Sequence, residues 1–405
     1  MKRLRDLFAS VLVLAGLVIA PPDAWQALSP ALQARSVQPI SPAAIHTATV
    51  FVISFPGFGT PRDDIDALTA ELIGLFKRGS MYHGYNDPWT EPYLAYEVYG
   101  GLVVEDPVLP LVLPNGMADY SNIYERYDLC PLIASGEVDE VWIWIAGGNG
   151  IDLAHFGEWV TTGPGWPGGF WPTPQMVNAP DCGQIVTTMA FNYEREVDVA
   201  LESFVHRLEG FSMTYFPCDF YTHTWPWTGA PAVCTGLVSD RYGYVARPFA
   251  GNNDVGGCGD AHHPPNILDD REYIYDDLTV VQSTCRDWGQ DGSAQVSSVN
   301  CTAWQCTHWG YHVWWMQNLP GYANTNRDRN GDLHPNWWAW IFGPCYDFNG
   351  SGDVGIGDVQ AVASHWGMVA TYPGWNPHLD LDQDRDVDVF DIATVAAEWA
   401  QRCPN

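Results

Sequence analysis

The sequence has few basic residues: 18 lysines and arginines stand against 48 aspartates and glutamates, and the formal net charge is −30. Nucleic-acid binding depends on lysine and arginine side chains that release counterions from phosphates, so this balance argues against a nucleic-acid partner. The same excess of acidic residues argues against binding to an anionic membrane surface. An acidic surface keeps an exported protein soluble and is compatible with calcium binding.

Several motifs are also missing. The chain has no P-loop, no G-x-S-x-G elbow, no H-E-x-x-H pair and no C-x-x-C pair. Without C-x-x-C, the ten cysteines do not resemble zinc knuckles, and we interpret them as disulfides of an oxidising compartment. Two candidate pairs join cysteines that are close in sequence, and a third pair lies on either side of the C-terminal tail. Sequence alone does not determine which cysteines are bonded. These pairs are Cys218/Cys234, Cys301/Cys306 and Cys345/Cys403.

The only long apolar run lies at the N-terminus. Lys2, Arg3 and Arg5 precede the apolar segment from Leu7 to Ala20, which is shorter than the roughly 20 residues of a membrane span. This pattern predicts a signal peptide over residues 1–27, cleaved between Ala20 and Ser36. The alternative is an uncleaved N-terminal anchor. We expect a secreted protein that has no membrane segment after signal cleavage.

The C-terminal tail contains an internal repeat. Asp347 to Trp366 and Asp380 to Trp399 align without a gap at an offset of 33 residues. Acidic or amide residues fall at positions 1, 3, 5 and 12 of each loop, apart from a serine at position 5 of the first, and position 7 offers its backbone carbonyl. Calcium takes six to eight oxygen ligands, so the repeat predicts two calcium ions. The expected ligands are Asp347, Asn349, Ser351, Asp353 and Asp358 in the first loop, and Asp380, Asp382, Asp384, Asp386 and Asp391 in the second.

Each loop leads into a helical pattern. Apolar residues at i, i+3 and i+7 predict two helices whose apolar faces pack together, with one valine of each loop packed between the loops. The residues of the two stripes are Val359, Val362 and Trp366, and Ile392, Val395 and Trp399; the loop valines are Val354 and Val387.

This duplicated unit, residues 345–403, resembles the type I dockerin family, whose signature is two calcium loops with Asp at position 12 and one helix per loop. The resemblance implies a small all-α, EF-hand-related domain over 345–405 that attaches to a cohesin-bearing scaffold or cell-surface protein. The family's recognition pair, at positions 10 and 11, corresponds here to Ile356-Gly357 and Val389-Phe390. Dockerin-like tails usually accompany polymer-degrading enzymes, so the resemblance also implies a polysaccharide substrate.

The preceding region, residues 36–344, forms the large domain. Apolar runs predict strands in an order that alternates with amphipathic helices, which indicates an α/β fold with a mostly parallel sheet. From Cys218 to Pro344 the pattern becomes short, cysteine-, tryptophan- and glycine-rich segments. We expect loops and short helices there, held by disulfides and covering one end of the sheet. The expected strands are Thr47–Phe55, Tyr93–Glu105, Glu140–Ala146 and Gly183–Phe191, and the expected helices are Asp63–Lys77, Tyr120–Ser135 and Glu194–Glu209.

The last of these helices carries the candidate catalytic residues. Glu202, His206 and Glu209 are spaced i, i+4, i+7 and share one face, and Glu194 lies in the first turn. A histidine between two carboxylates can act as a general base. It can also be half of a metal site, completed by His262 or His263. The alternative is a solvated charged face stabilised by i,i+4 pairs.

These patterns lead to three hypotheses for the function. The first is a secreted hydrolase that acts on extracellular polysaccharide or its decoration, because two carboxylates or a His–carboxylate pair suffice for a glycosyl or ester bond. The second is a non-catalytic carbohydrate-binding or adhesion protein, with sugar platforms at Trp225, Trp227 and Trp337–Trp340. The third is a secreted metallopeptidase, which is favoured if His206 and His262 converge within about 4 Å.

Overall fold

The structure is a computed structural model that describes fifteen segments of the chain. The predicted signal peptide and Trp225 and Trp227 lie outside them. None of the helices in these segments combines the length and apolar character that a bilayer crossing requires. The described residues are 44–55, 63–104, 113–114, 116–145, 158–163, 178–216, 255–269, 271–288, 295–327, 334, 336–342, 346–348, 353–369, 379–381 and 386–399.

A six-stranded sheet forms the centre of the large domain. Its order is β2-β1-β4-β6-β5, and β3 also pairs with β1. All pairings are parallel except that of β5, which runs antiparallel to β6. The predicted α/β fold with a mostly parallel sheet is therefore confirmed. The strands are β1 (His46–Phe55), β2 (Leu94–Val98), β3 (Val103–Val104), β4 (Glu140–Ile145), β5 (Trp159–Thr162) and β6 (Val186–Asn192).

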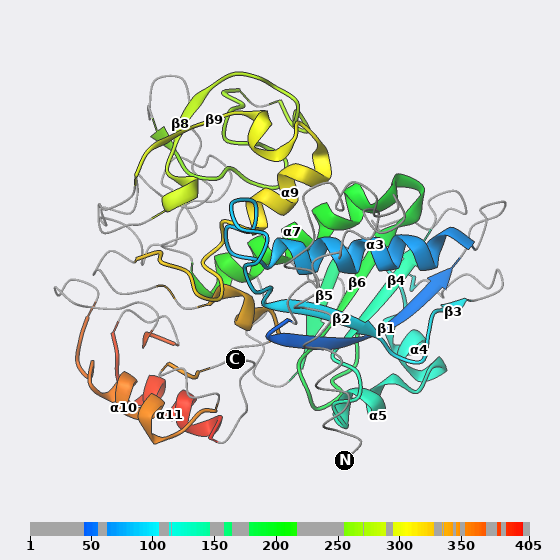
Figure 1. Ribbon diagram of the computed structural model, residues 1–405. Helices are drawn as coiled ribbons and strands as arrows, with labels where there is room; N and C mark the ends of the chain where they lie inside the picture. The colour runs from blue at the N-terminus through cyan, green and yellow to red at the C-terminus, as the bar shows by residue number, and fades with distance from the viewer. Residues whose placement is uncertain are drawn as a thin grey trace, which may run out of the picture. The chain divides into compact units, whose positions relative to one another are not determined.

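Helices cover both faces of this sheet (Figure 1). On one face, α3 (Asp63–Gly79) and α7 (Glu196–Tyr215) pack against Val50 and Val52 and their neighbours. On the other face lie α4 (Tyr120–Arg126) and α5 (Leu129–Ala134). Successive strand residues point to opposite faces, so a strand covered on both sides is predominantly apolar. The buried runs of β1 and β4 have this composition, apart from Ser54 and Glu140.

Most of the predicted elements of the large domain are confirmed, with three differences. The predicted helix Tyr120–Ser135 is two helices, because Asp128 adopts a left-handed conformation with φ of 51°. The predicted strand region Tyr93–Glu105 contains two short strands, β2 and β3. Strand β5 was not predicted, and it has only four residues.

The cysteine-rich half contains a second, three-stranded sheet and several short helices. Strands β7 (Val255–Gly256), β8 (Val281–Ser283) and β9 (Ser297–Val299) form the sheet. Helix α9 (His308–Met316) packs against α3 and α7, the two helices on one face of the large sheet. Three disulfides join described cysteines, and one of them is the predicted Cys301–Cys306. The other two are Cys130–Cys182 and Cys258–Cys285.

The tryptophan cluster of the last short helix, η8 (Trp337–Phe342), belongs to the core. Trp337, Trp338 and Trp340 are at most 7% exposed, and Trp337 stacks on Phe216 with ring centroids 4.6 Å apart. A sugar ring requires an open aromatic face. The interpretation of this cluster as a sugar platform is therefore wrong.

The C-terminal repeat forms two helices, α10 (Ile356–Ala363) and α11 (Val389–Ala397), which contact each other. Val354, Val387, Val362 and Val395 are buried in one small core, as the repeat predicts. The tryptophans of the two stripes are not buried, however. Trp366 and Trp399 are 59% and 56% exposed, because the helices end before them.

Candidate metal centre

Helix α7 carries the first half of the candidate site. Its apolar face, which includes Leu201, Phe204 and Leu208, packs into the large core. The opposite face carries Glu202 and His206 one helical turn apart. Glu202 and Glu209 are 6% and 9% exposed, and His206 is half-buried. The interpretation of this face as a solvated charged surface is therefore wrong.

His206 is held between carboxylates. Its Nδ1 lies 2.9 Å from Oε2 of Glu209, so Nδ1–H donates to that carboxylate and Nε2 points away from it. The other oxygen of Glu209 accepts the backbone N–H of Ala261 at 2.8 Å. Glu209 thus orients the imidazole and ties α7 to the loop after β7.

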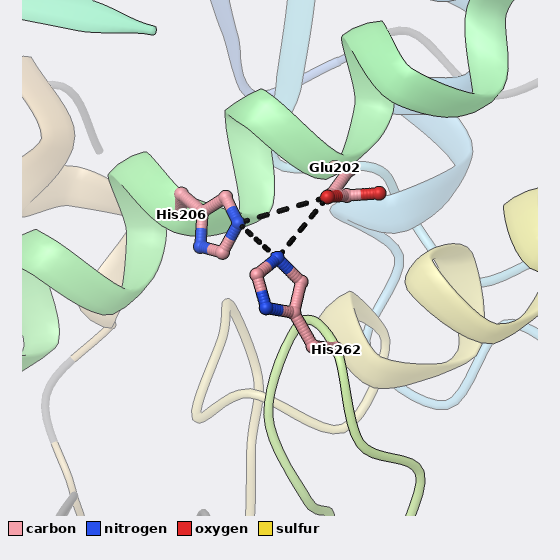
Figure 2. A group of neighbouring side chains, drawn as sticks. All are labelled: Glu202, His206 and His262. Atoms are coloured by element: carbon pink, nitrogen blue, oxygen red, sulfur yellow. Dashed lines mark hydrogen bonds and ion pairs between the residues drawn. The ribbon is translucent and has the colours of Figure 1, made fainter. Parts of the chain in front are cut away.

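That loop provides the second half of the site through His262 (Figure 2). Nε2 of His262 lies 2.9 Å from Nε2 of His206 and 3.2 Å from Oε1 of Glu202. The remaining separation, between His206 Nε2 and Glu202 Oε1, is 3.9 Å. Two imidazole nitrogens and one carboxylate oxygen from distant parts of the sequence therefore converge on one point.

The loop is fixed in place by α9 and by a disulfide. Cys258 is bonded to Cys285. The indole N–H of Trp315 donates to the carbonyl of Gly259 at 2.9 Å, and Nε2–H of His312 donates to the carbonyl of Ala261 at 2.9 Å. Gly259 has a φ of +77°, and a Cβ at this position would lie 2.2 Å from the His263 carbonyl oxygen. The loop therefore depends on glycine at this turn.

Three further side chains border the convergence point. Glu158, which directly precedes β5, has a carboxylate oxygen 4.0 Å from His206 Nε2. The hydroxyl of Tyr273 lies 3.3 Å from His262 Nε2, and a carboxylate oxygen of Glu272 lies 3.7 Å from His262 Nδ1. Tyr273 is half exposed and Glu158 is about a third exposed, so this side of the site opens to solvent.

The proximity of acids and imidazoles shifts the pKa of several groups. Burial alone would lower the pKa of His206 and His262, but hydrogen bonds to carboxylates raise both above the usual value. Burial alone would raise the pKa of Glu202, but close contacts with His206, His262 and His308 hold it well below its usual range. Burial raises the pKa of Glu158, although nearby His206 opposes the shift. Glu202 is therefore a carboxylate, whereas Glu158 holds a proton more readily than an ordinary glutamate.

The three converging atoms have the spacing of ligands around one small cation. Their separations are 2.9, 3.2 and 3.9 Å. A point equidistant from them lies about 2.0 Å from each, and zinc bonds to His nitrogen and carboxylate oxygen measure about 2.0–2.2 Å. Two histidines with one glutamate are a known ligand set of catalytic zinc. The carboxylates beside each Nδ1 leave both Nε2 atoms facing the point, as ligating histidines require.

The sequence identified part of this site. Glu202, His206 and Glu209 lie together, and of the two expected partners His262 joins them, whereas His263 Nδ1 instead contacts Asp260 at 2.9 Å. The side chain of Glu194 lies outside the described part of the chain. Sequence reasoning missed Glu158, Tyr273, and the pair His308 and His312. Of these residues, only His308 and His312 form a pattern that is recognisable in the sequence, namely two histidines at i and i+4.

The described calcium-loop residues of the two repeats match at position 12 and differ in burial at positions 1 and 7. Asp358 and Asp391, at position 12 of each loop, are fully buried, and each accepts the backbone N–H of the residue three before it, at 2.8 and 2.7 Å. Asp380 is 4% exposed, Asp347 and Asp386 are half-buried, and Asp353 is exposed. Four expected ligands lie outside the described residues, namely Asn349, Ser351, Asp382 and Asp384.

Comparison with known proteins gives no match: no family model, no curated protein and no solved structure matches this chain.

Proposed function

We propose that the large domain is a metal-dependent hydrolase with a zinc-type centre formed by Glu202, His206 and His262. The observation that carries this proposal is the convergence of the two Nε2 atoms and the Glu202 oxygen within 3.9 Å of one another. In a protein without metal, two imidazole Nε2 atoms at 2.9 Å must share a proton. A cation satisfies both lone pairs and the carboxylate together.

The surrounding residues suit hydrolysis of a carbonyl compound. When bound, a zinc ion supplies Lewis acidity: it lowers the pKa of water to about 7 and polarises a carbonyl oxygen. Glu158 lies on the open side, with a carboxylate oxygen 4.0 Å from His206 Nε2, and would take a proton from the attacking water and return it to the leaving group. The Tyr273 hydroxyl is placed to donate a hydrogen bond to the developing oxyanion. Glu209 and Glu272 orient the two imidazoles.

The same arrangement disfavours a glycosidase that uses two carboxylates. Such enzymes require two carboxyl groups that face each other across the sugar. Glu202 and Glu209 instead flank His206, and both contact it. We propose that the bond attacked is an amide or an ester, whose carbonyl oxygen a bound Lewis acid would polarise, and that the substrate is a peptide or an acyl decoration of extracellular polysaccharide.

The test uses the full-length chain, stripped of metal with dipicolinate and reloaded with zinc. We expect zinc-dependent hydrolysis of either casein peptides or acetylated xylan, and the two assays distinguish the substrate sources. His262→Asn removes the ligating nitrogen and is expected to abolish zinc binding at this site. Glu158→Gln is expected to retain zinc and lose about 10²–10⁴-fold in rate.

His365→Asn, a histidine outside the cluster, is the matched control and is expected to behave like the unmodified protein. Failure of the unmodified protein to bind zinc would refute the proposal. Equal zinc binding by His262→Asn would refute it as well.

A second candidate function concerns the C-terminal segment, which we infer to be a calcium-binding, dockerin-like attachment module. The inference is supported by the equivalent burial and hydrogen bonding of Asp358 and Asp391. The two expected recognition positions are apolar and exposed: Ile356 is 60% exposed, Val389 50% and Phe390 63%. Such exposed residues are suited to a protein partner, for which we propose a cohesin-bearing scaffold or cell-surface protein.

Calcium titration of the chelator-treated chain tests this inference. Two bound ions are expected, and Asp358→Asn and Asp391→Asn are each expected to remove one of them. Surface immobilisation of a type I cohesin then tests the partner, with Phe390→Ser as the variant expected to weaken capture. Calcium binding that survives both aspartate substitutions would contradict the inference.

A further inference from the structure

Two histidines of α9 lie on the other side of Glu202 from the metal centre described above. His308 and His312 are one helical turn apart and share a face of α9. Nε2 of His308 lies 3.0 Å from Oε2 of Glu202, whereas Oε1 of the same carboxylate faces His206 and His262. The two oxygens of Glu202 therefore point to two different pairs of histidines.

His312 has an unused nitrogen in a buried position. Its side chain is fully buried, and Nε2–H donates to the Ala261 carbonyl. This hydrogen bond fixes the tautomer, so Nδ1 carries a lone pair. Nδ1 is buried and has no hydrogen-bond partner. Buried polar atoms are nearly always satisfied, and an exception requires an explanation such as an ion.

His308 shows a related feature. Its Nε2 is buried and, although it lies 3.0 Å from Oε2 of Glu202, it is not aligned for a hydrogen bond with it. Two ligands of one zinc ion are separated by about 3.3 Å and do not point at each other. One ligand atom from each of Glu202, His308 and His312 lies within 4.8 Å of the others.

We propose that Glu202 bridges two divalent cations, and that the second is held by Oε2 of Glu202, Nε2 of His308 and Nδ1 of His312. This inference rests on the proposed hydrolase function and deepens it. In two-metal hydrolases, ions about 3.5–4 Å apart stabilise both the attacking and the leaving oxygen. A carboxylate with histidine pairs on both of its oxygens is the bridge that such a centre requires.

The charge around Glu202 is consistent with two cations. Several carboxylates lie in this region: Glu158, Glu209 and Glu272 beside the first site, Asp198 beside His308, and Glu202 between them. A divalent cation at each site would offset part of this partly buried negative charge.

The experiment measures zinc stoichiometry in the full chain, with excess calcium present to occupy the C-terminal segment. The chain is stripped of metal with dipicolinate and then reloaded with zinc. We expect it to bind two zinc ions per chain. His312→Gln keeps a donor for the Ala261 carbonyl but lacks the Nδ1 ligand, and His308→Asn lacks the Nε2 ligand. Each variant is expected to bind one zinc ion. Asp358→Asn/Asp391→Asn is the control for zinc bound at the C-terminus and is expected to retain two.

A spectroscopic measurement tests the bridge. With two equivalents of Co²⁺, the unmodified protein is expected to show an electron paramagnetic resonance signal weakened by coupling between the ions. His308→Asn with one equivalent is expected to show the full signal of an isolated ion. Because His308 is 21% exposed, this variant is expected to fold even if His312→Gln does not, and circular dichroism checks both.

The outcomes separate this inference from the proposed function. One zinc ion in the unmodified protein, retained in His308→Asn and His312→Gln, overturns the second site and leaves the single-metal hydrolase intact. No zinc in the unmodified protein overturns both. Two zinc ions with uncoupled cobalt signals overturn the bridging role of Glu202.

Discussion

Arg207 and Glu140 form an ion pair in which both side chains are completely buried, with Arg207 Nη1 2.7 Å from Glu140 Oε1. Tyr96 and Trp142 also donate hydrogen bonds to the Glu140 carboxylate, each at 3.0 Å. Arg207 in turn donates to the carbonyl of Ile341 at 2.8 Å. The pair joins α7 to β4 and η8 immediately behind the face that carries His206.

Arg207→Met is expected to lower the free energy of unfolding by about 3–5 kcal/mol, because it leaves the Glu140 charge buried without its partner. The comparison is Arg271→Met, which breaks the exposed pair with Asp269 and is expected to cost less than about 1 kcal/mol. Urea denaturation followed by tryptophan fluorescence measures both. Equal costs for the two variants would contradict this account.

At the residue scale, His83 also leads to a prediction about how the stability of the fold depends on pH. Its ring stacks on Tyr82, and burial lowers its pKa from 6.5 to about 4. The unfolded chain therefore binds a proton that the folded chain does not, and His83 reduces stability as pH falls from 6.5 towards 4. The full effect is about 3.4 kcal/mol, the 2.5-unit difference in pKa multiplied by 1.36 kcal/mol per unit.

His83→Asn is expected to remove this part of the acid destabilisation, because asparagine does not titrate and tolerates the residue's φ of 53°. Urea unfolding at pH 7 and pH 4.5 gives the two free energies for each protein. The variant should lose less stability than the unmodified chain between these pH values. Parallel losses in the two proteins would show that His83 is not responsible.

Helical periodicity predicted at residue level that Glu202, His206 and Glu209 share a face. It could not show that the face is buried, because burial depends on α9 and on the loop that carries His262. Glu158 and Tyr273 reach the site from separate segments, and no local pattern connects them with α7. His308 and His312 have the i,i+4 spacing of a ligand pair, but their function depends on Glu202, which lies more than 100 residues earlier.

At the scale of elements, the backbone conformation of the loop after β7 determines where His262 lies relative to α7. Gly259→Ala is expected to distort the loop, since its Cβ would meet the His263 carbonyl oxygen. Gly100→Ala is the matched control, because Gly100 also has positive φ but nothing within 4 Å of a Cβ. The control is expected to cost about 1–2 kcal/mol in backbone strain, and Gly259→Ala clearly more.

The same two variants separate stability from metal binding. Gly259→Ala is expected to weaken zinc binding, measured by isothermal titration calorimetry, because it displaces His262. Gly100→Ala is expected to leave zinc affinity unchanged. Unaltered zinc affinity in a folded Gly259→Ala protein would show that this turn does not position His262.

The elements that the sequence predicted well are those with long, uniform patterns. Strands β1 and β4 are buried on both faces, and continuous runs of apolar residues identify them. β5 has four residues, and β7 to β9 have two or three, so their short patterns do not stand out. Their positions depend on the partner strand and on nearby disulfides, which local periodicity does not encode.

At the scale of the whole molecule, the charge of −30 is the dominant property. Mutual repulsion of like charges destabilises a compact state, and salt screens it: the Debye length falls from about 30 Å at 0.01 M to about 8 Å at 0.15 M. We therefore expect the melting temperature of the metal-free protein to rise with sodium chloride. The rise should be smaller for the protein loaded with zinc and calcium, whose bound cations already offset part of the charge.

Differential scanning calorimetry at matched osmolality, with sucrose in place of salt as the control, measures this effect. A melting temperature that is independent of salt in the metal-free protein would indicate that the acidic residues are far enough apart for repulsion to be negligible.

The Cys258–Cys285 bond has a consequence for when the protein becomes active. Helix α7 brings its two ligands as soon as it folds, whereas His262 depends on a loop anchored by an oxidised cysteine pair. A chain still in a reducing cytosol is thus expected to hold an incomplete metal centre. Oxidation of the pair would then complete the site, so that, under the proposed hydrolase function, activity begins only in an oxidising compartment.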